Sequence, residues 1–401
     1  MPSLSRIVDN GLCTGCGACA AAIGRADLTM AMTDQGFLRP APVELTAAQE
    51  RVLDAVCPGA RLDGKAAEPE YHPLWGPVQT VATGHATDPA VRYRGSSGGV
   101  LTALAIGLVT SGEVEFVLTN GAAADDPINN ATRAAATRDD LMATAGSRYA
   151  PSSPLAAIEP HLAAGRRFAF IGKPCDIAGL ARMARRDPRI DAQIPYRLAF
   201  FCAGVPSRQG TLAVLKALGV EHADCASFQY RGDGWPGLAR ARRHDGTEAS
   251  MDYNSSWGTI LNRHLQFRCK ICPDGTGEFA DLSCADAWYG KDGYPDFAER
   301  DGRSLIVART ARGQALLERA LGEGWIATEP LDIGEIARMQ PYQVTRKRNA
   351  FARIAAVLLA RGTRPRFRGM KLWQLALAES KIGQLRNAWG TWRRSRGKTL
   401  N

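Results

Sequence analysis

The chain has 401 residues, of which 45% are hydrophobic and 22% are charged, a composition typical of globular proteins and not of disordered ones. Its first residues lack the apolar segment of a secretory signal, and no run of about 18 uncharged apolar residues predicts a transmembrane helix. The formal charge of +10 is uneven, because residues 341–401 contain 15 Lys or Arg against one acid, Glu379. We therefore expect a cytoplasmic protein with a slightly acidic body and a basic C-terminal tail.

In chain order, the first predicted unit is a small cysteine-containing module at 1–72 that ends in a polar linker at 63–70. Strand-like and helical patterns then alternate between about 75 and 335, which indicates an α/β or α+β domain. Buried strands are predicted at 114–119, 167–171, 197–201 and 305–308, and helices at 98–110 and 212–218. The tail at 341–401 is predicted to be helical, with a break at Arg364-Pro365.

The first cysteine set is a C-x2-C-x2-C run followed 38 residues later by Cys-Pro. Its members are Cys13, Cys16, Cys19 and Cys57. Small residues between the cysteines let backbone amides point at sulfur, and a separate thiolate followed by proline is typical of ferredoxin runs. Four thiolates could instead hold zinc, but structural zinc sites usually pair their cysteines as two C-x2-C knuckles. The spacing predicts a [4Fe–4S] cluster in a ferredoxin-like module.

Four later cysteines could form a second site. Cys175 and Cys202 each stand at the end of a predicted strand, and Cys269 and Cys272 form a C-x2-C pair. Spacing alone does not separate this interpretation from buried cysteines that act as small apolar residues.

Several longer motifs stand in a characteristic order. They are GSSGGVLTALAIGLVTSGEV at 95–114, TAGSRYAPSS at 144–153, GKPCDIAGL at 172–180, FFCAGVPS at 200–207, YRGDGWPG at 230–237, FRCKICPDGTGEFADLSCADAW at 267–288 and GRSLIVART at 302–310. Together they resemble the beta-subunit family of coenzyme F-420 hydrogenases and dehydrogenases, iron–sulfur flavoproteins that include 7-hydroxymethyl chlorophyll a reductase-like and divinyl chlorophyllide vinyl reductase-like proteins. The resemblance covers roughly residues 10–320 and excludes the tail.

This resemblance implies that the four later cysteines hold a second [4Fe–4S] cluster near a flavin. It also implies FAD in a mixed-sheet core, with a flavin-binding part at 75–165 and a part at 166–335 that shares the flavin and holds the second cluster. Cys225 and Cys284 are left over. We expect Cys225 to be a core residue and Cys284 to be structural, with a role as an alternative ligand left open for Cys284.

The flavin site implied by the resemblance includes the turn before an apolar helix, namely Ser96, Ser97, Gly98 and Gly99. A helix N-terminus offers free amides to a phosphate, although a tight loop with a serine cap would have the same sequence. Arg148 could pair with pyrophosphate and Tyr149 could stack on a ring, or they could be a surface arginine and a core tyrosine. Lys173 could stabilise reduced, anionic flavin as a catalytic residue, or only tune the cluster. No G-x-G-x-x-G fingerprint follows a strand, so a Rossmann nicotinamide site is not indicated.

We expect an oxidoreductase in which a one-electron donor such as ferredoxin feeds two clusters, then FAD, then an organic acceptor. One alternative is an electron-transfer subunit of a larger hydrogenase or dehydrogenase complex. Another is a reductase for a polysaccharide or lipid-linked precursor, docked to the anionic inner membrane face by 341–401. Nucleic-acid binding is not expected, because no such motif accompanies the basic charge. A homo-oligomer stays open. Truncation near Pro341 is expected to leave clusters and FAD in place, because all the motifs end before about residue 310.

Overall fold

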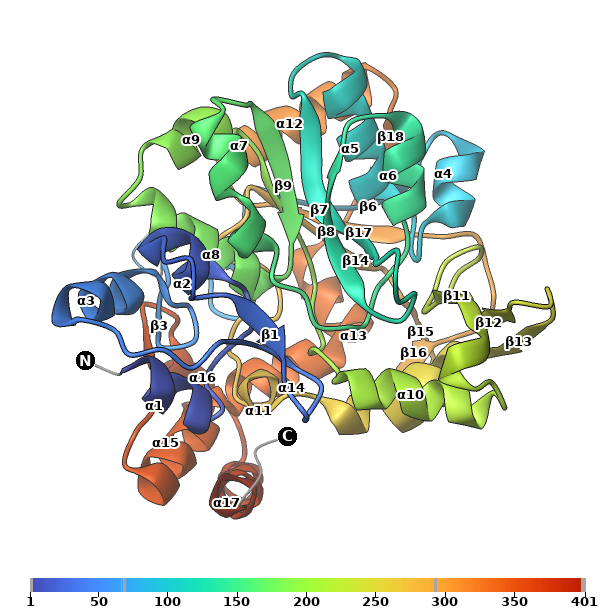
Figure 1. The fold of residues 1–401 in the computed structure, drawn as a ribbon. Coiled ribbons are helices and arrows are strands. Elements are labelled where there is room, and N and C mark those ends of the chain that lie inside the picture. The colour runs from blue at the N-terminus through green and yellow to red at the C-terminus, as the bar shows by residue number, and fades with distance from the viewer. Residues whose placement is uncertain (1–2, 66, 68–69, 292–293, 398–401) are drawn as a thin grey trace.

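The protein is built around one eight-stranded sheet (Figure 1), in a computed structural model that describes residues 3–65, 67, 70–291 and 294–397. The strand order is β18-β6-β17-β14-β10-β9-β7-β8. The strands are β6 (Thr80–Ala86), β7 (Phe116–Ala122), β8 (Asn130–Ala135), β9 (Phe168–Gly172), β10 (Arg197–Phe200), β14 (Leu282–Asp286), β17 (Ser304–Ala308) and β18 (Ile326–Pro330). The four strands from β14 to β7 run parallel and the outer pairings are antiparallel, so the expected mixed sheet is confirmed.

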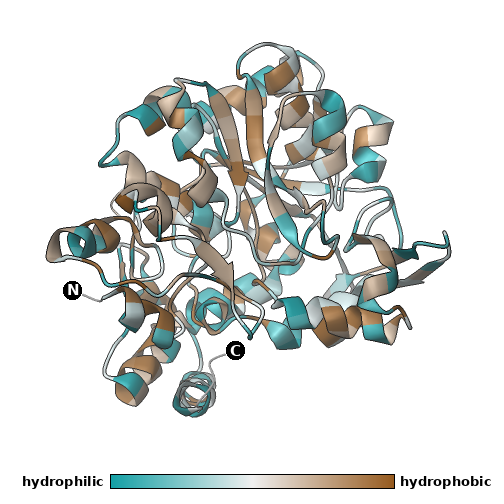
Figure 2. Cartoon of the chain, in the orientation of Figure 1, coloured by the Kyte–Doolittle hydropathy of each residue, from teal (hydrophilic) through white to brown (hydrophobic). Residues whose placement is uncertain are grey.

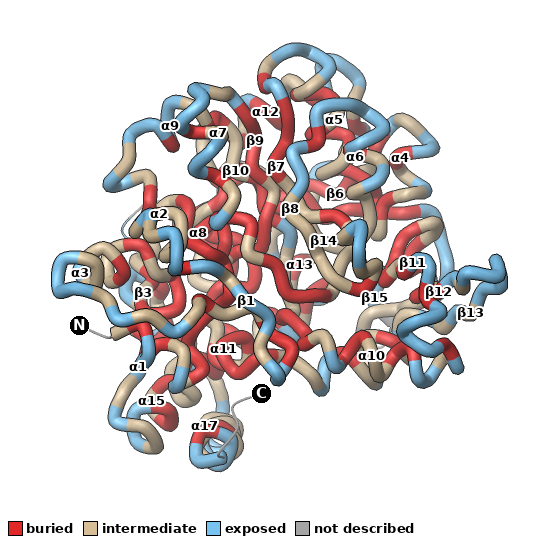
Figure 3. Tube along the Cα trace, in the orientation of Figure 1, coloured by how far each residue is buried: buried red, intermediate tan, exposed pale blue. Residues whose placement is uncertain are grey.

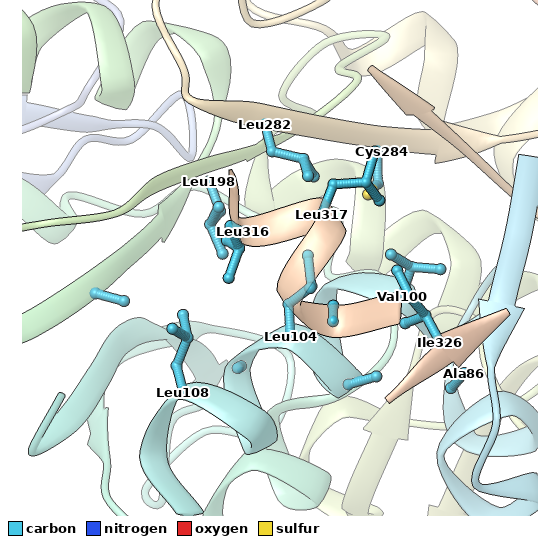
Figure 4. Packing of buried hydrophobic residues seen from close by; sticks show 14 of the residues in the cluster. Ala86, Val100, Leu104, Leu108, Leu198, Leu282, Cys284, Leu316, Leu317 and Ile326 are labelled. Atoms are coloured by element: carbon cyan, nitrogen blue, oxygen red, sulfur yellow. The ribbon is translucent and has the colours of Figure 1, made fainter. Parts of the chain in front are cut away.

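The strands are apolar along their length because helices cover both faces of the sheet. In β9, Phe168 and Phe170 enter the core cluster on one face, while Ala169 between them enters the cluster on the other. α8 (Pro174–Ala184) packs on the first face, and α5 (Val100–Thr110) and α12 (Ala311–Gly322) pack on the second. Figure 4 shows Leu317 of α12 beside Cys284 of β14, with Leu104 of α5 in the same cluster. The central strands are hydrophobic in Figure 2 and buried in Figure 3.

Smaller elements surround this core. They are α4 (Pro89–Arg94), α6 (Arg138–Thr144), α7 (Glu159–Ala163), α9 (Arg189–Gln193), α10 (Arg208–Ala217), β11 (Cys225–Gln229), β12 (Ala239–Arg243), β13 (Glu248–Met251), α11 (Phe267–Lys270), β15 (Tyr289–Lys291), β16 (Tyr294–Asp296) and α13 (Ile336–Met339). β11, β12 and β13 form a separate antiparallel sheet. A π-helical segment at Asn254–Ile260 follows that sheet, and Trp257 of this segment and Tyr253 just before it line the large cavity described below.

The N-terminal module packs onto both the core and the tail. Its elements are α1 (Leu4–Asp9), α2 (Ala18–Ile23), the hairpin of β1 (Met30–Met32) and β2 (Leu38–Pro40), α3 (Ala47–Val56) and β3 (Arg61–Asp63). Leu12 and Leu53 share a core cluster with Phe267 and Val357, so the cluster contains side chains from distant parts of the chain. Within the expected linker, residues 66, 68 and 69 lie outside the described residues, and the short strand β4 (Tyr71–His72) follows and pairs with β5 (Gly76–Pro77).

The tail is largely helical, and it is part of the folded body. It contains α14 (Pro341–Arg348), α15 (Ala350–Arg361), β19 (Arg366–Arg368), α16 (Leu372–Leu377) and α17 (Lys381–Arg396), with the predicted break falling between α15 and β19. β19 pairs in parallel with β3, and Figure 1 shows the red tail helices beside the blue N-terminal module. The expectation of a tail independent of the body is therefore wrong. Within the described ranges, no helix combines the length and apolarity needed to cross a bilayer.

Candidate functional site

The first cysteine set gathers in the loop between α1 and α2, in the first turn of α2 and at the end of α3. Gly15 and Gly17 have φ of +78° and +85°, a backbone conformation that other residues rarely adopt, and it lets the loop turn tightly. The Gly15 amide donates a hydrogen bond to Cys13 Sγ at 3.4 Å. Burial raises the pKa of Cys19 well above its ordinary value, and the other three thiols of the set raise it further. The charges of Cys13, Cys16 and Cys57 thus act on the Cys19 thiol, so the four cysteines of the set lie in one region of the module.

The second cysteine set gathers where loops leave the parallel part of the sheet. β9 and β10 are adjacent and parallel, so the chain segments after their carboxyl ends lie at the same sheet edge. Cys175 stands in the first turn of α8 and Cys202 follows β10. All four later cysteines line one small cavity: Cys175, Cys202, Cys269 and Cys272. Val205 N and Gln266 Nε2 donate to Cys269 Sγ at 3.4 and 3.3 Å, the kind of contact that sulfur ligands of a cluster accept.

Two arginines also line this small cavity. Arg268 is 2% exposed, and its Nε and Nη1 atoms have no hydrogen-bond partner among the described residues. Arg346 donates to the backbone carbonyls of Cys202, at 2.8 Å, and Ala203. A buried cation without a counter-charge is costly. The cavity therefore fits an anionic group, and a thiolate-ligated iron–sulfur cluster is one.

The two cysteine sets lie next to each other. Thr14 of the first loop lines the cavity of the second set. A Cβ placed on Gly179 of α8 would lie 3.6 Å from Cys16 Sγ, so the helix that contains Cys175 in its first turn also contacts the first set. Burial is the main reason that the pKa of Cys175 is raised, and Cys16 and Cys202 both contribute.

A larger cavity of about 230 Å³ lies on the other side of the second set, and Cys202 and Val205 line both cavities. Of the residues expected to bind flavin, all but Gly98 line the larger cavity: Ser96, Ser97, Gly99, Arg148, Tyr149 and Lys173. Gly98 instead packs against the sheet, where its amide donates to Ser304 Oγ at 2.9 Å. A Cβ at Gly98 would come within 2.5 Å of Gly84 O. Close backbone packing therefore explains this glycine without any ligand.

Arg148 is engaged by the protein itself. Its guanidinium donates to Asn130 Oδ1 at 2.6 Å and to the backbone carbonyls of Pro127, Asn129 and Phe228. These bonds use four of its five N–H groups. The position of Arg148 is explained by a role in holding the cavity wall together. Only its remaining N–H group is free to bind a pyrophosphate. The Tyr149 ring contacts Trp257 with centroids 4.6 Å apart, so it belongs to an aromatic wall.

Lys173 lies between the larger cavity and the second cysteine set. Its Nζ is 2.8 Å from Asp176 Oδ2 and donates to Ser152 Oγ at 2.6 Å. Burial lowers the pKa of Lys173, but Asp176 together with the thiols of Cys175 and Cys202 raises it, so that the pKa lies above its ordinary value. The side chain is therefore a fixed cation at the cavity wall.

The sequence interpretation missed several residues that shape the larger cavity. Arg231 is buried, pairs with Asp286 at 2.8 Å, and donates to Ser96 O at 2.5 Å, which holds the glycine-rich turn in place. Arg231 stands inside the YRGDGWPG motif, but its acidic partner is 55 residues away and no local spacing indicates it. Gln340 and Tyr342 also line the cavity, although every motif of the sequence ends before about residue 310.

With this geometry in place, two family models match the chain. The N-terminal model of the coenzyme F420 hydrogenase/dehydrogenase beta subunit matches residues 81–159, and the C-terminal model matches 165–333. The chain belongs to the coenzyme F420 hydrogenase/dehydrogenase beta-subunit family. The glycine-rich turn and the second cysteine set of this beta-subunit family member lie within the matched residues. The first cysteine set and the segment after 333 lie outside them.

Relatives of this family member are distant in sequence. The coenzyme F420 hydrogenase subunit beta of Methanococcus voltae is 23% identical over 270 residues, which cover 64% of this chain and 86% of that protein. The coenzyme F420-dependent sulfite reductase of Methanocaldococcus jannaschii is 24% identical over 78% of this chain and 46% of its own length. A chain of the F420-reducing [NiFe] hydrogenase complex from Methanosarcina barkeri shares the fold, with a TM-score of 0.53 and 19% identity over 70% of this chain and 95% of that one. These relatives support an oxidoreductase role.

Proposed function

We propose that this protein is an electron-transfer subunit of a larger oxidoreductase, with two [4Fe–4S] clusters and FAD. The relatives favour this role over a self-contained reductase fed by ferredoxin, because those from Methanococcus voltae and Methanosarcina barkeri are named as hydrogenase subunits. The observation that carries the proposal is the position of the second cysteine set. The second cysteine set lies between the larger cavity, whose wall includes Cys202, and the first cysteine set, whose Cys16 is near Cys175.

The donor sets support clusters over single metal ions. Structural zinc sites usually pair their cysteines as two C-x2-C knuckles, whereas the first set here is a C-x2-C-x2-C run followed by Cys-Pro. Eight cysteines in two groups of four, with amide donors to sulfur and an unpaired arginine beside them, suit two cubanes.

The residues around the larger cavity have separate tasks in this proposal. The turn at Ser96, Ser97 and Gly99 would hold a phosphate of FAD at the start of α5. Tyr149 and Trp257 would shield the ring from water, and Lys173 would hold a positive charge near it. When bound, the clusters would exchange single electrons and the flavin would provide two-electron chemistry.

Anaerobic purification of the full chain tests the proposal. We expect iron, sulfide and FAD in the protein, and a second oxidoreductase subunit that co-purifies from the native cells in a fixed ratio. The reduced protein would then be mixed with a panel of organic acceptors that includes coenzyme F420. Zinc in place of iron would overturn the cofactor assignment. A lone, cofactor-loaded chain that turns over with ferredoxin would favour the self-contained reductase instead.

A further inference from the structure

The last helix, α17, presents one unusual face to solvent. Ile382, Leu385 and Trp389 are spaced three and four residues apart, so they project from the same side, and they are 74%, 70% and 60% exposed. Figure 1 shows α17 at the lower edge of the molecule beside α15. Half of the large hydrophobic residues that are exposed among the described residues lie between 358 and 389. Scattered exposed apolar side chains need no explanation, but a concentration of them indicates an interaction surface.

Three arginines interleave with these apolar side chains. Arg386, Arg393 and Arg396 follow Ile382 by 4, 11 and 14 residues, which places them on the same helical face. All three are exposed, and none forms an ion pair with any other described residue. We call these six residues, Ile382, Leu385, Arg386, Trp389, Arg393 and Arg396, the tail face.

The opposite side of α17 is fixed to the protein by polar contacts. Arg353 of α15 donates two hydrogen bonds to Asn387 Oδ1, at 3.0 and 2.7 Å. Gln384 donates to Arg348 O at 3.0 Å, and Arg361 donates to Ser395 O at 2.5 Å. Because hydrogen bonds orient the helix, the tail face points outward in a defined direction and would need little ordering to bind a partner.

We propose that the tail face docks the protein onto an anionic membrane surface. A basic amphipathic helix with Trp, Leu and Ile on its apolar side lies in the lipid interface, and its arginines are attracted to acidic head groups. Trp389 has an apolar ring with a polar N–H, which suits the boundary between head groups and acyl chains. The proposal does not rest on the redox function.

The charge of the tail favours an anionic membrane over a second copy of the chain as the partner of the tail face. The segment 341–401 has one acid among 15 basic residues, so two tail faces brought together would repel. An acidic protein would satisfy the arginines, but the interleaved pattern alternates apolar and cationic groups along one helix, as a lipid interface does. A protein partner and a second copy are outcomes that the experiment below separates.

The test is flotation of the full chain with vesicles. One preparation contains phosphatidylcholine alone and the other contains phosphatidylcholine with phosphatidylglycerol. We expect the protein to float only with the acidic vesicles and to be released by added salt, because salt screens charges over about 8 Å at physiological ionic strength. Iron and flavin content, measured on the same samples, keeps this result separate from the redox proposal.

Two sets of variants locate the binding to the tail face. The triple variant Arg386→Gln/Arg393→Gln/Arg396→Gln should weaken vesicle binding on the order of 100-fold, from about 1 kcal/mol per basic residue at an acidic surface. The double variant Ile382→Ser/Leu385→Ser should weaken it about 10-fold or more, through lost apolar burial. The matched controls change exposed residues elsewhere: Arg242→Gln/Arg263→Gln/Arg338→Gln, and Leu238→Ser/Leu321→Ser. Both controls should bind like the unchanged protein.

Four results would overturn the proposal. The first is equal flotation with neutral and acidic vesicles. The second is binding that both tail-face variants retain. The third is a protein that does not bind vesicles but self-associates in sedimentation experiments, with the self-association abolished by Ile382→Ser/Leu385→Ser. That result would assign the face to a second copy of the chain. Absence of vesicle binding by a monomeric protein would overturn it equally and leave an acidic protein as the occupant to test.

Discussion

Lys347 Nζ lies 2.5 Å from Glu278 Oε1, and both side chains are buried. Tyr71 OH donates to the other carboxylate oxygen of Glu278 at 2.8 Å. This buried group joins the tail, the loop after the second cysteine pair and the segment after the N-terminal module. The tail is thereby fastened to the loop that follows Cys272.

Lys347→Met should destabilise the protein, because it leaves Glu278 buried without its counter-charge. The loss is expected to be about 3–5 kcal/mol in the free energy of unfolding, the usual result of breaking a buried ion pair from one side. Thermal or denaturant unfolding measures it. Lys381→Met, at an exposed lysine of the same tail, should cause little change. The double variant Lys347→Met/Glu278→Gln should recover part of the loss, and no recovery would contradict a simple charge effect.

Deletion of residues 341–401 should remove the second cluster and the flavin. Arg346 and Gln343 hydrogen-bond the Cys202 carbonyl at 2.8 and 3.2 Å, and Tyr342 lines the larger cavity. Iron and FAD analysis of the purified protein measures the effect. Deletion from Lys381 onward removes α17 but not α14, so the second cluster and the flavin should stay in place. Full cofactor content after the longer deletion would show that the α14 contacts are dispensable.

The two cysteine sets should load separately. The reconstituted chain is expected to contain about eight iron atoms, and either Cys16→Ala or Cys272→Ala should reduce this to about four. Cys225→Ala is the matched control, because Cys225 is buried in a cluster apart from both sets. Electron paramagnetic resonance of the reduced variants should show a different remaining signal in each. Loss of both signals from one substitution in a folded protein would contradict two independent sites.

Arg268→Gln should lower the reduction potential of the second cluster. The unpaired Nε and Nη1 of Arg268 lie at the cavity of that cluster, and a nearby cation favours the reduced, more negative state. A redox titration followed by electron paramagnetic resonance measures the shift. Arg263→Gln, an exposed neighbour in sequence, should leave the potential unchanged. An unchanged potential in Arg268→Gln would assign the arginine to packing alone.

Gly99→Ala should cost flavin binding. Gly99 has φ of +73°, and a Cβ there would lie 2.6 Å from Val91 O, so the turn before α5 would have to move. Gly112→Ala separates this clash from backbone strain, since Gly112 has φ of +71° and nothing within 4 Å of the added Cβ. In both variants, alanine in the left-handed backbone conformation should lower the free energy of unfolding by about 1–2 kcal/mol. Only Gly99→Ala should lose FAD, as measured by absorbance of the purified protein.

The sequence by itself predicted a first cysteine set, four of the eight strands of the sheet (β7, β9, β10 and β17) and, through its motifs, the family. The second cysteine set and the mixed sheet were predicted only through the family resemblance. Ligand spacing such as C-x2-C-x2-C is local and is therefore visible in one dimension. Long apolar runs identify strands covered on both faces, as at 167–171, which the structure has as β9. The first strand predicted from the sequence, at 114–119, corresponds to β7, which begins two residues later, at Phe116. The prediction began early because the apolar run begins before the strand does.

Only the tertiary structure decided how these parts meet. Lys347 and Glu278 are 69 residues apart in the sequence, Arg231 and Asp286 are 55 apart, and Arg148 and Phe228 are 80 apart. No local pattern encodes such pairs. From its basic composition, the tail was expected to be separate from the catalytic body. In the structure, several of its basic side chains form ion pairs or hydrogen bonds inside the fold. Net charge counts side chains without regard to burial, so it could not distinguish Lys347, which fastens the tail to the body, from Arg393, which faces solvent.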